Sequence, residues 1–334
     1  VLAVAEASLA NASRRLDEPE ANLPGGNRLR IINGCEGEPI WIAHLANIGV
    51  GPGKQNYKID PNGFHDFITQ GGLGAARYWP KMGCDNNGEH CALGGSGGPS
   101  ENCNKGDDYS QCAPPVDTKF EGTYGQANQP CDPKLPSTMA GCDFVDVSLV
   151  DGWTLPFTLD ISGGECIGSG SNEPVTHIDC KGLTLDNCPD ADDLGDGTVS
   201  MQAKNPHTGQ VAGCYGPCLK LVDDKWNNLE AKGQTRDDKS VVPYCCTTPP
   251  MTSETCNAGP IVETAYVKAV HQHCPGAYAF AYDDGRGLLR CPSTTNYKLT
   301  FFCPSSSAIK PPPAPTTAPA PAPTPPSPAP VSTI

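Results

Sequence analysis

The sequence predicts a mainly β protein whose loops are held together by disulfides, and three observations lead to this prediction. The chain contains 18 cysteines, an even number that indicates nine disulfides made in an oxidising compartment. Its 37 glycines and 35 prolines separate short apolar runs, as in strand-rich domains with many turns. From Phe144 to Leu149 the side chains alternate with the period of a strand. We therefore expect a secreted, extracellular protein.

The charge balance excludes two classes of partner. The 334 residues carry 37 acidic and 23 basic side chains, a net charge of −14. This charge opposes binding to nucleic acid phosphates and to anionic lipid. It does not oppose a neutral ligand such as a polysaccharide, and it favours a cationic protein partner.

The two ends of the chain differ in composition from its body. Residues 1–27 begin with VLAVAEASLANA, typical of the end of a signal peptide, and contain a glycosylation sequon at Asn11 that depends on the cleavage position. Residues 305–334 are rich in Pro, Ala, Thr and Ser, and we expect a disordered spacer there. No hydrophobic segment follows this spacer, so we expect no membrane span.

The body, residues 28–304, opens and closes on segments that read as strands, RLRIINGC at 28–35 and NYKLTFFCP at 296–304. The Gly-rich stretch 83–116 contains four cysteines and is predicted to be a small stapled lobe. The stretch 180–274 contains eight cysteines. Its best helix lies in 261–274, where apolar residues recur at helical spacing.

The segment 142–156, CDFVDVSLVDGWTLP, contains two carboxylates that its strand pattern does not require. Asp146 falls on the face opposite Val145 and Val147. Asp151 precedes Gly152, and an Asp-Gly pair between apolar runs is a strong hairpin signal. The simpler interpretation is one solvated Asp and one turn Asp. The alternative is an acidic site to which other parts of the chain contribute.

Seven motifs together identify a resemblance to a known family. In chain order they are IINGC at 31–35, AARYWPKMGC at 75–84, FVDVSLVDGWTLP at 144–156, GCYGPC at 213–218, YCCTTPPMTSETC at 244–256, HCPGAYAFAYDD at 273–284 and NYKLTFFCP at 296–304. In this order they resemble thaumatin-like proteins, the fifth class of plant pathogenesis-related proteins. The resemblance implies a flattened antiparallel β-sandwich with two smaller disulfide-rich lobes, at about 83–116 and 181–274, and a monomer.

The resemblance also implies eight disulfide pairs. The two cysteines left over, Cys131 and Cys142, are predicted to form a ninth bridge outside the usual set. The implied pairs are Cys35 with Cys303, Cys84 with Cys91, Cys103 with Cys112, Cys166 with Cys291, Cys180 with Cys274, Cys188 with Cys214, Cys218 with Cys245, and Cys246 with Cys256.

The family commonly has an acidic cleft between the sandwich and the larger lobe, associated with β-1,3-glucan binding. By match to its motifs, the ligand-binding residues are Arg77, Asp146, Asp151, and Asp283 or Asp284, with Tyr78 and Trp153 as aromatic contacts. The family's Glu is less well matched, because DTKFEGTYG at 117–125 replaces its usual stretch. Glu121 is the nearest residue, and a shift of one position would turn its side chain to the other face of a strand.

These residues favour binding over catalysis. Cleavage of a glycoside needs two carboxyls, one protonated and one ionised, and Glu121 with Asp151 would serve if the protein is hydrolytic. We therefore expect a β-glucan or other wall polysaccharide as partner, a defence or wall role, and at most weak endo-β-1,3-glucanase activity. The alternative is an inhibitor that docks on a foreign glycosidase or protease, and a role carried by the Pro-rich tail also stays open.

No cofactor or metal is expected. His271 and His273 could bind a metal, but they fall at a predicted helix end, where the helix dipole favours His.

Overall fold

The computed structural model describes residues 26–47, 51, 53–95, 116–126, 128–204, 209–223, 228, 231 and 233–304. The predicted signal remnant before residue 26, the sequon at Asn11 and the Pro-rich tail lie outside these ranges. So does the predicted pair Cys103 and Cys112.

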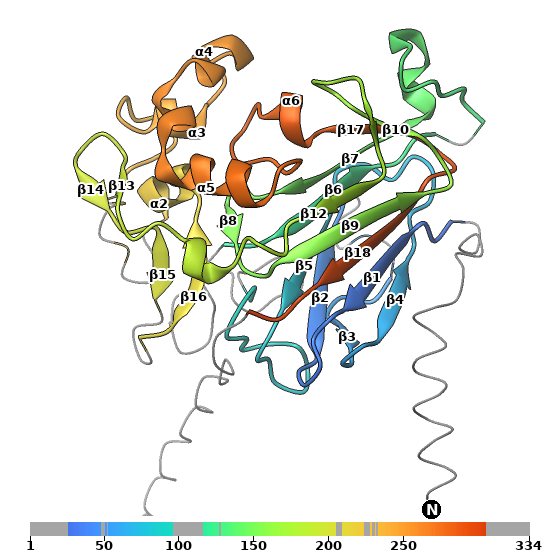
Figure 1. Ribbon diagram of the computed structural model, residues 1–334, viewed down its shortest axis with the longest axis horizontal. Coiled ribbons are helices and arrows are strands. Elements are labelled where there is room, and N and C mark those ends of the chain that lie inside the picture. The colour runs from blue at the N-terminus through green and yellow to red at the C-terminus, as the bar shows by residue number, and fades with distance from the viewer. Residues whose placement is uncertain are drawn as a thin grey trace, which may run out of the picture.

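Two β-sheets form the body of the protein (Figure 1). The larger sheet has eight strands in the order β11-β10-β17-β7-β6-β5-β2-β3. In that order they are β11 (Pro174–Val175), β10 (Cys166–Gly168), β17 (Leu289–Pro292), β7 (Cys142–Ser148), β6 (Lys119–Thr123), β5 (Ala76–Lys81), β2 (Ile40–Leu45) and β3 (Tyr57–Ile59). The pairings within this sheet are antiparallel.

The smaller sheet has five strands in the order β12-β9-β18-β1-β4. It pairs the two ends of the body, because β1 lies beside β18 in parallel, the exception to the otherwise antiparallel pattern. Both predicted terminal strands are therefore confirmed. The five are β12 (His177–Asp179), β9 (Phe157–Ser162), β18 (Asn296–Phe301), β1 (Leu29–Asn33) and β4 (Phe64–Phe67).

A core of apolar side chains joins the two sheets into the predicted sandwich. Phe120 of the larger sheet packs on Tyr297 of the smaller one, with ring centroids 5.8 Å apart. Tyr78 packs edge-on against Phe67 at 5.1 Å. The alternation predicted for β7 is confirmed, because Val145 and Val147 are buried in this core.

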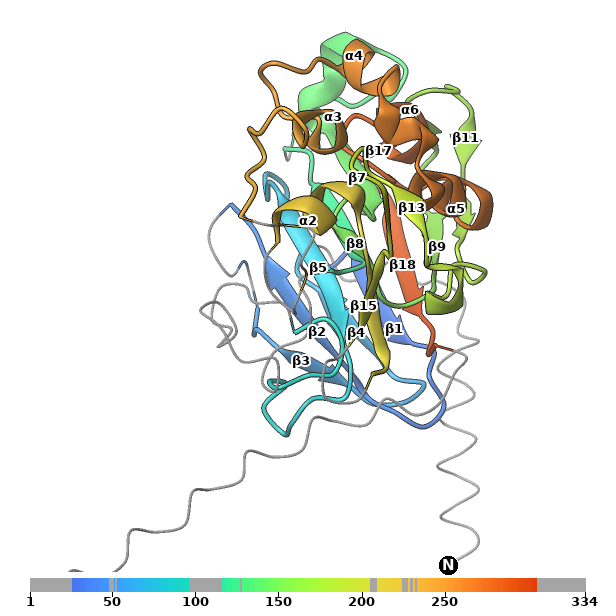
Figure 2. The ribbon, with the colours of Figure 1, turned by 90° about the vertical axis from the view of Figure 1, so that its left-hand side faces the viewer.

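The larger lobe gathers at one end of the sheets (Figures 1 and 2). It contains a three-stranded sheet, β15-β16-β8, and the strand pair β13-β14. Its strands are β8 (Gly152–Trp153), β13 (Asp192–Asp193), β14 (Thr198–Val199), β15 (Gln202–Lys204) and β16 (Val211–Tyr215), and its helices are η3 (Leu185–Asn187), α2 (Pro217–Val222), α3 (Val242–Cys245), α4 (Ser253–Asn257), η4 (Pro260–Glu263) and α5 (Ala265–His273). Two further short helices are η2 (Pro136–Gly141), before β7, and α6 (Asp284–Gly287), before β17.

Two local expectations need correction. Asp151 and Gly152 do form a turn, in which the Gly152 amide donates to the Leu149 carbonyl. The strands on either side do not form a hairpin, because β8 pairs with β16 of the lobe instead of with β7. The helix predicted over 261–274 starts late, since Pro260–Glu263 is a separate 3₁₀ turn and the Thr264 side chain caps α5.

Eight disulfides are present among the described residues, and none of the described cysteines is free. Seven of them are pairs implied by the resemblance. The eighth joins Cys131 to Cys142, as predicted for the bridge outside the usual set. The seven are Cys35–Cys303, Cys84–Cys91, Cys166–Cys291, Cys180–Cys274, Cys188–Cys214, Cys218–Cys245 and Cys246–Cys256.

Candidate functional site

Three charged residues form a row across the outer face of the larger sheet. Arg77 on β5 lies directly opposite Glu121 on β6, and Glu121 lies directly opposite Asp146 on β7. Opposite residues of an antiparallel pair point to the same face, with Cβ atoms roughly 5 Å apart. Glu121 is therefore on the same face as Asp146, and the departure of its sequence motif from the family pattern does not turn it away.

The residues of the row differ in how well their side chains are paired. Arg77 Nε forms a salt bridge with Glu121. The Oδ1 atom of Asp146, in contrast, is buried and has no hydrogen-bond partner among the described residues. Burial and the nearby negative charges of Glu121 and Asp284 raise the pKa of Asp146 well above its usual value, and Arg77 offsets only part of this effect. Asp146 therefore holds a proton at pH values where an exposed Asp would be ionised.

Asp151 has the opposite environment. Lys119, also on β6, donates to Asp151 Oδ2 at 2.5 Å, and Arg236 of the lobe lies 3.9 Å from Oδ1. Burial acts to raise the pKa of Asp151, but the positive charges of Lys119, Arg236 and Arg77 together lower it. This carboxylate stays ionised. The pair with Arg236 also joins the sheet to the larger lobe.

The last carboxylate, Asp284, begins α6, which follows a loop that contains Tyr278. The amide of Tyr278 donates to the carbonyl of Val147, so this loop lies alongside β7. The Tyr278 hydroxyl donates to Asp284 Oδ1 at 2.5 Å. Asp284 in turn acts electrostatically on Asp146. We call the group formed by these residues the carboxylate site: Arg77, Lys119, Glu121, Asp146, Asp151, Asp284.

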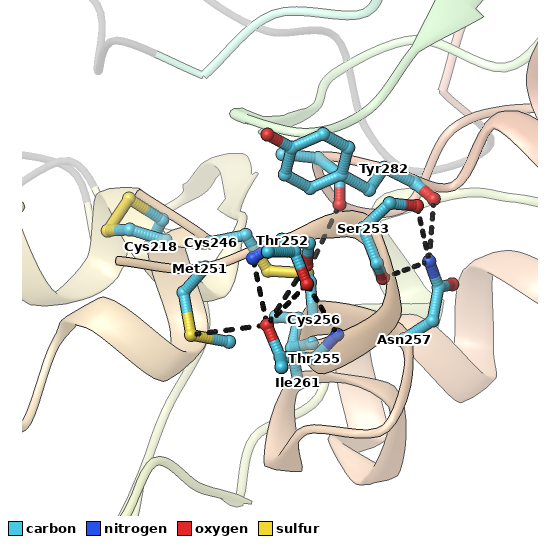
Figure 3. Close-up of a disulfide and its surroundings, with 12 residues drawn as sticks. Cys218, Cys246, Met251, Thr252, Ser253, Thr255, Cys256, Asn257, Ile261 and Tyr282 are labelled. Atoms are coloured by element: carbon cyan, nitrogen blue, oxygen red, sulfur yellow. Dashed lines mark hydrogen bonds between the residues drawn. A yellow bond between two sulfur atoms is a disulfide. The ribbon is translucent and has the colours of Figure 1, made fainter. Parts of the chain in front are cut away.

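The larger lobe holds Tyr282, which lies two residues before Asp284 in the sequence (Figure 3). Tyr282 has a φ of 70°, a left-handed conformation that is costly for an aromatic residue. Its carbonyl accepts a hydrogen bond from Asn257 Nδ2 at 3.1 Å, and its hydroxyl bonds with Thr248. The Cys246–Cys256 disulfide holds the segments that carry these two partners. These contacts compensate for the backbone strain.

The structure separates the two Asp residues that the sequence left as alternatives. Asp283 is buried, with 4% of its surface exposed, and faces the lobe interior. It accepts hydrogen bonds from the amide of Ala279 at 3.0 Å and from His271 Nε2 at 2.8 Å. Asp284, by contrast, faces the carboxylate site.

The two predicted aromatic contacts lie inside the protein. Tyr78 is 1% exposed, between the sheets, and Trp153 is 0% exposed, packed against Tyr266. Because β5 alternates, Tyr78 points to the face opposite Arg77. Neither ring can stack on a ligand at the surface.

Sequence reasoning missed Lys119 and Arg236. A signal for Lys119 existed, since it precedes Glu121 by two positions on one strand and must share its face. Arg236 had no such signal, because its segment and Asp151 are brought together only by the fold.

The described part of the chain contains no helix that is both long and apolar enough to cross a membrane.

Comparisons with known proteins show the family of the chain. The family model "Thaumatin family" matches residues 33–304. A protein of Prunus avium named glucan endo-1,3-beta-glucosidase is 31% identical over 233 residues, covering 68% of this chain and 71% of its own. Thaumatin-like protein 1 of Arabidopsis thaliana is 27% identical over 288 residues, covering 84% and 87%.

Among solved structures, a GH family 64 laminaripentaose-producing beta-1,3-glucanase from Paenibacillus barengoltzii aligns with a TM-score of 0.46 and 12% identity. The alignment covers 86% of this chain and 78% of that one. A likeness at that level says nothing about activity.

Proposed function

The chain belongs to the thaumatin family, and we propose that it is a secreted protein that binds a β-1,3-glucan-type polysaccharide at the carboxylate site. The observation that carries this proposal is the row formed by Arg77, Glu121 and Asp146 across three neighbouring strands. A rigid row of donors and acceptors on a sheet is suited to a ligand that presents regularly spaced hydroxyl groups. The printed name of the Prunus avium relative supports the same ligand class.

The electrostatics of the site agree with a neutral ligand. Arg77 pairs with Glu121, and Lys119 and Arg236 lie beside Asp151, so most of the charge is balanced within the protein. An anionic polymer would meet the net charge of −14. A neutral sugar polymer meets no such barrier.

We expect hydrolysis of the glucan to contribute less than binding. A glycosidase needs one protonated carboxyl and one ionised carboxyl on either side of the scissile bond. Asp146 and Asp151 differ in this way, whereas the sequence had suggested Glu121 and Asp151 for the two roles. The ionised member is held by Lys119, which makes it a weak nucleophile or base. We therefore propose binding with at most slow endo-β-1,3-glucanase activity, in a defence or wall-associated role.

Retention on insoluble β-1,3-glucan, beside cellulose, xylan and chitin, tests the proposal with the full-length chain. Glu121→Ala/Asp146→Ala removes two members of the row and is expected to reduce retention about tenfold or more. The matched control is Asp160→Ala/Asp179→Ala, which removes two partly exposed, ion-paired carboxylates from the smaller sheet. The control is expected to bind like the wild type.

Soluble reducing ends, assayed in the same tubes, separate binding from cleavage. Retention without released sugar identifies a binder, and released sugar that Asp151→Asn abolishes identifies an enzyme. If the wild type is retained on no polysaccharide, or if the row variant binds as well as the control, the proposal is wrong. An inhibitor that acts through surface loops would give the first of these results.

A further inference from the structure

We propose that Lys119 divides the carboxyls of this site into two units: it fixes Asp151 in a permanent ion pair, and it leaves Asp146, beside Glu121, as the carboxyl that holds a proton. Only the consequence for ligand binding rests on the function proposed above. The division itself is a property of the free protein.

The position of Lys119 is the first step. Its side chain is only 15% exposed and lies on the same face of β6 as Glu121. Its ammonium contacts Asp151 at 2.5 Å and lies 3.9 Å from Asp117, another buried carboxylate. A buried ammonium needs an anionic partner, and Asp151 is the nearer one. Lys119 is therefore a positioning residue that decides which carboxylate is neutralised.

Asp151 lies between two cations, of which Lys119 is the one within hydrogen-bond distance. Lys119 takes Oδ2, and Arg236 lies on the side of Oδ1. A carboxylate between two cations strongly resists protonation, and a sugar hydroxyl would have to compete with charged donors for it. This unit links the sheet to the lobe and is not the part of the site that exchanges protons.

Glu121 and Asp146 form the second unit. The antiparallel register places them directly opposite each other. Arg77 forms a salt bridge with Glu121 and not with Asp146. Two adjacent carboxyls resist carrying two negative charges, so the remaining proton is held at Asp146. The burial of its unpartnered Oδ1 atom adds to this preference.

The groups that face Asp146 from other elements favour the same state. Asp284 of α6 adds a second nearby negative charge, and the Tyr278 hydroxyl is engaged with Asp284 at 2.5 Å. Arg77 is the one cation that acts on Asp146 among these neighbours, and it is already paired with Glu121. A protonated Asp146 is therefore the neutral hydrogen-bond donor of the site, suited to a sugar oxygen.

The division can be tested without ligand by carbon NMR of side-chain carboxyls in the oxidised, full-length chain, with signals assigned from Asp→Asn variants. We expect Asp146 to titrate above the ordinary Asp range and Asp151 below it. In Lys119→Met, which keeps the length and most of the volume of the side chain, the Asp151 midpoint should rise by about 1 pH unit or more. Lys119→Arg should restore it.

Lys134→Met is the matched control. Lys134 lies away from the site, and its ammonium forms an exposed ion pair with Glu165 at a distance of 3.0 Å. It should leave both midpoints unchanged. An Asp146 midpoint in the ordinary range, or an Asp151 midpoint that Lys119→Met does not move, would overturn the inference. Asp151→Asn gives a second check, because it leaves Lys119 in place and should keep the high midpoint of Asp146.

Glucan retention as a function of pH separates this inference from the proposed function. Retention should fall as the pH rises through the Asp146 midpoint, and Asp146→Asn, which keeps a donor that does not titrate, should remove that dependence. If Asp146 and Asp151 show the expected midpoints but the protein is not retained on glucan, the proposed function is wrong and the division stands. If the protein is retained but Asp146 titrates below Asp151, the proposed function stands and the division is wrong.

Discussion

Asp143 and Asp146 lie on the same strand, β7, but on opposite faces and with different hydrogen-bond environments. Asp143 is fully buried between the sheets and has a partner for each oxygen: Arg28 donates to both, the amide of Gly125 donates at 2.8 Å, and the Tyr297 hydroxyl donates at 2.8 Å. Asp146 faces the carboxylate site with one oxygen unpartnered among the described residues. A buried carboxylate that is fully paired serves stability, whereas a buried carboxyl that lacks partners favours its protonated form.

The largest effect on stability is expected from a substitution at Asp143. Asp143→Asn leaves the Arg28 guanidinium, 12% exposed, without its counter-ion, and we expect a loss of about 3 to 5 kcal/mol in the free energy of unfolding. Asp146→Asn should lose little, because a protonated Asp and an Asn differ only slightly. Guanidinium unfolding with the disulfides intact measures both. Equal losses would remove the distinction between the two sites.

The Cys131–Cys142 bridge should matter for stability alone. It ends at Cys142, next to Asp143, and it closes a loop of 11 residues. Cys131→Ala/Cys142→Ala is expected to cost about 2 to 3 kcal/mol by chain entropy. Thermal unfolding measures this cost, and glucan retention below the transition should equal that of the wild type. Lost retention in a folded variant would show that this bridge also shapes the carboxylate site.

The pH dependence of stability should have opposite signs at the two ends of the carboxylate site. The raised pKa of Asp146 gives stability that is present below its unfolded value of about 3.9 and is lost as the pH rises through the folded value. The free energy of unfolding of Asp146→Asn should therefore increase relative to that of the wild type as the pH rises, by about 1.4 kcal/mol for each unit by which the pKa of Asp146 is raised.

Asp151 has a lowered pKa, so its stability is present above about pH 3.9 and is lost as the pH falls through the folded value. Asp151→Asn should be less stable than the wild type at neutral pH and approach it in acid. Unfolding free energies from about pH 3 to 8 check both slopes. Parallel curves for the two variants would contradict the assignment.

The smallest effect is expected for Arg236→Ala. The Arg236 side chain is 52% exposed and lies 3.9 Å from Asp151, so the pair is screened by solvent. We expect a change of about 0 to 1 kcal/mol at low salt that disappears in about 1 M salt. A larger, salt-independent loss would show that Arg236 joins the lobe to the sheet by more than charge.

The sequence by itself determined much of the fold. The alternation in 144–149 correctly separates the buried valines from Asp146, because side-chain direction along one strand is a local property. The cysteine count together with the family resemblance led to the bridge between Cys131 and Cys142. These conclusions depend on short segments or on counts, and neither requires knowledge of which strands meet.

Only the tertiary structure decided how the carboxyls divide. Glu121 shares a face with Asp146 because of the register between β6 and β7, which follows from hydrogen bonds between separate segments. The burial of Tyr78 and Trp153 depends in the same way on what the second sheet and the lobe place over them. Protonation is decided last, since the pKa of Asp146 and that of Asp151 reflect burial and neighbouring charges contributed by distant elements.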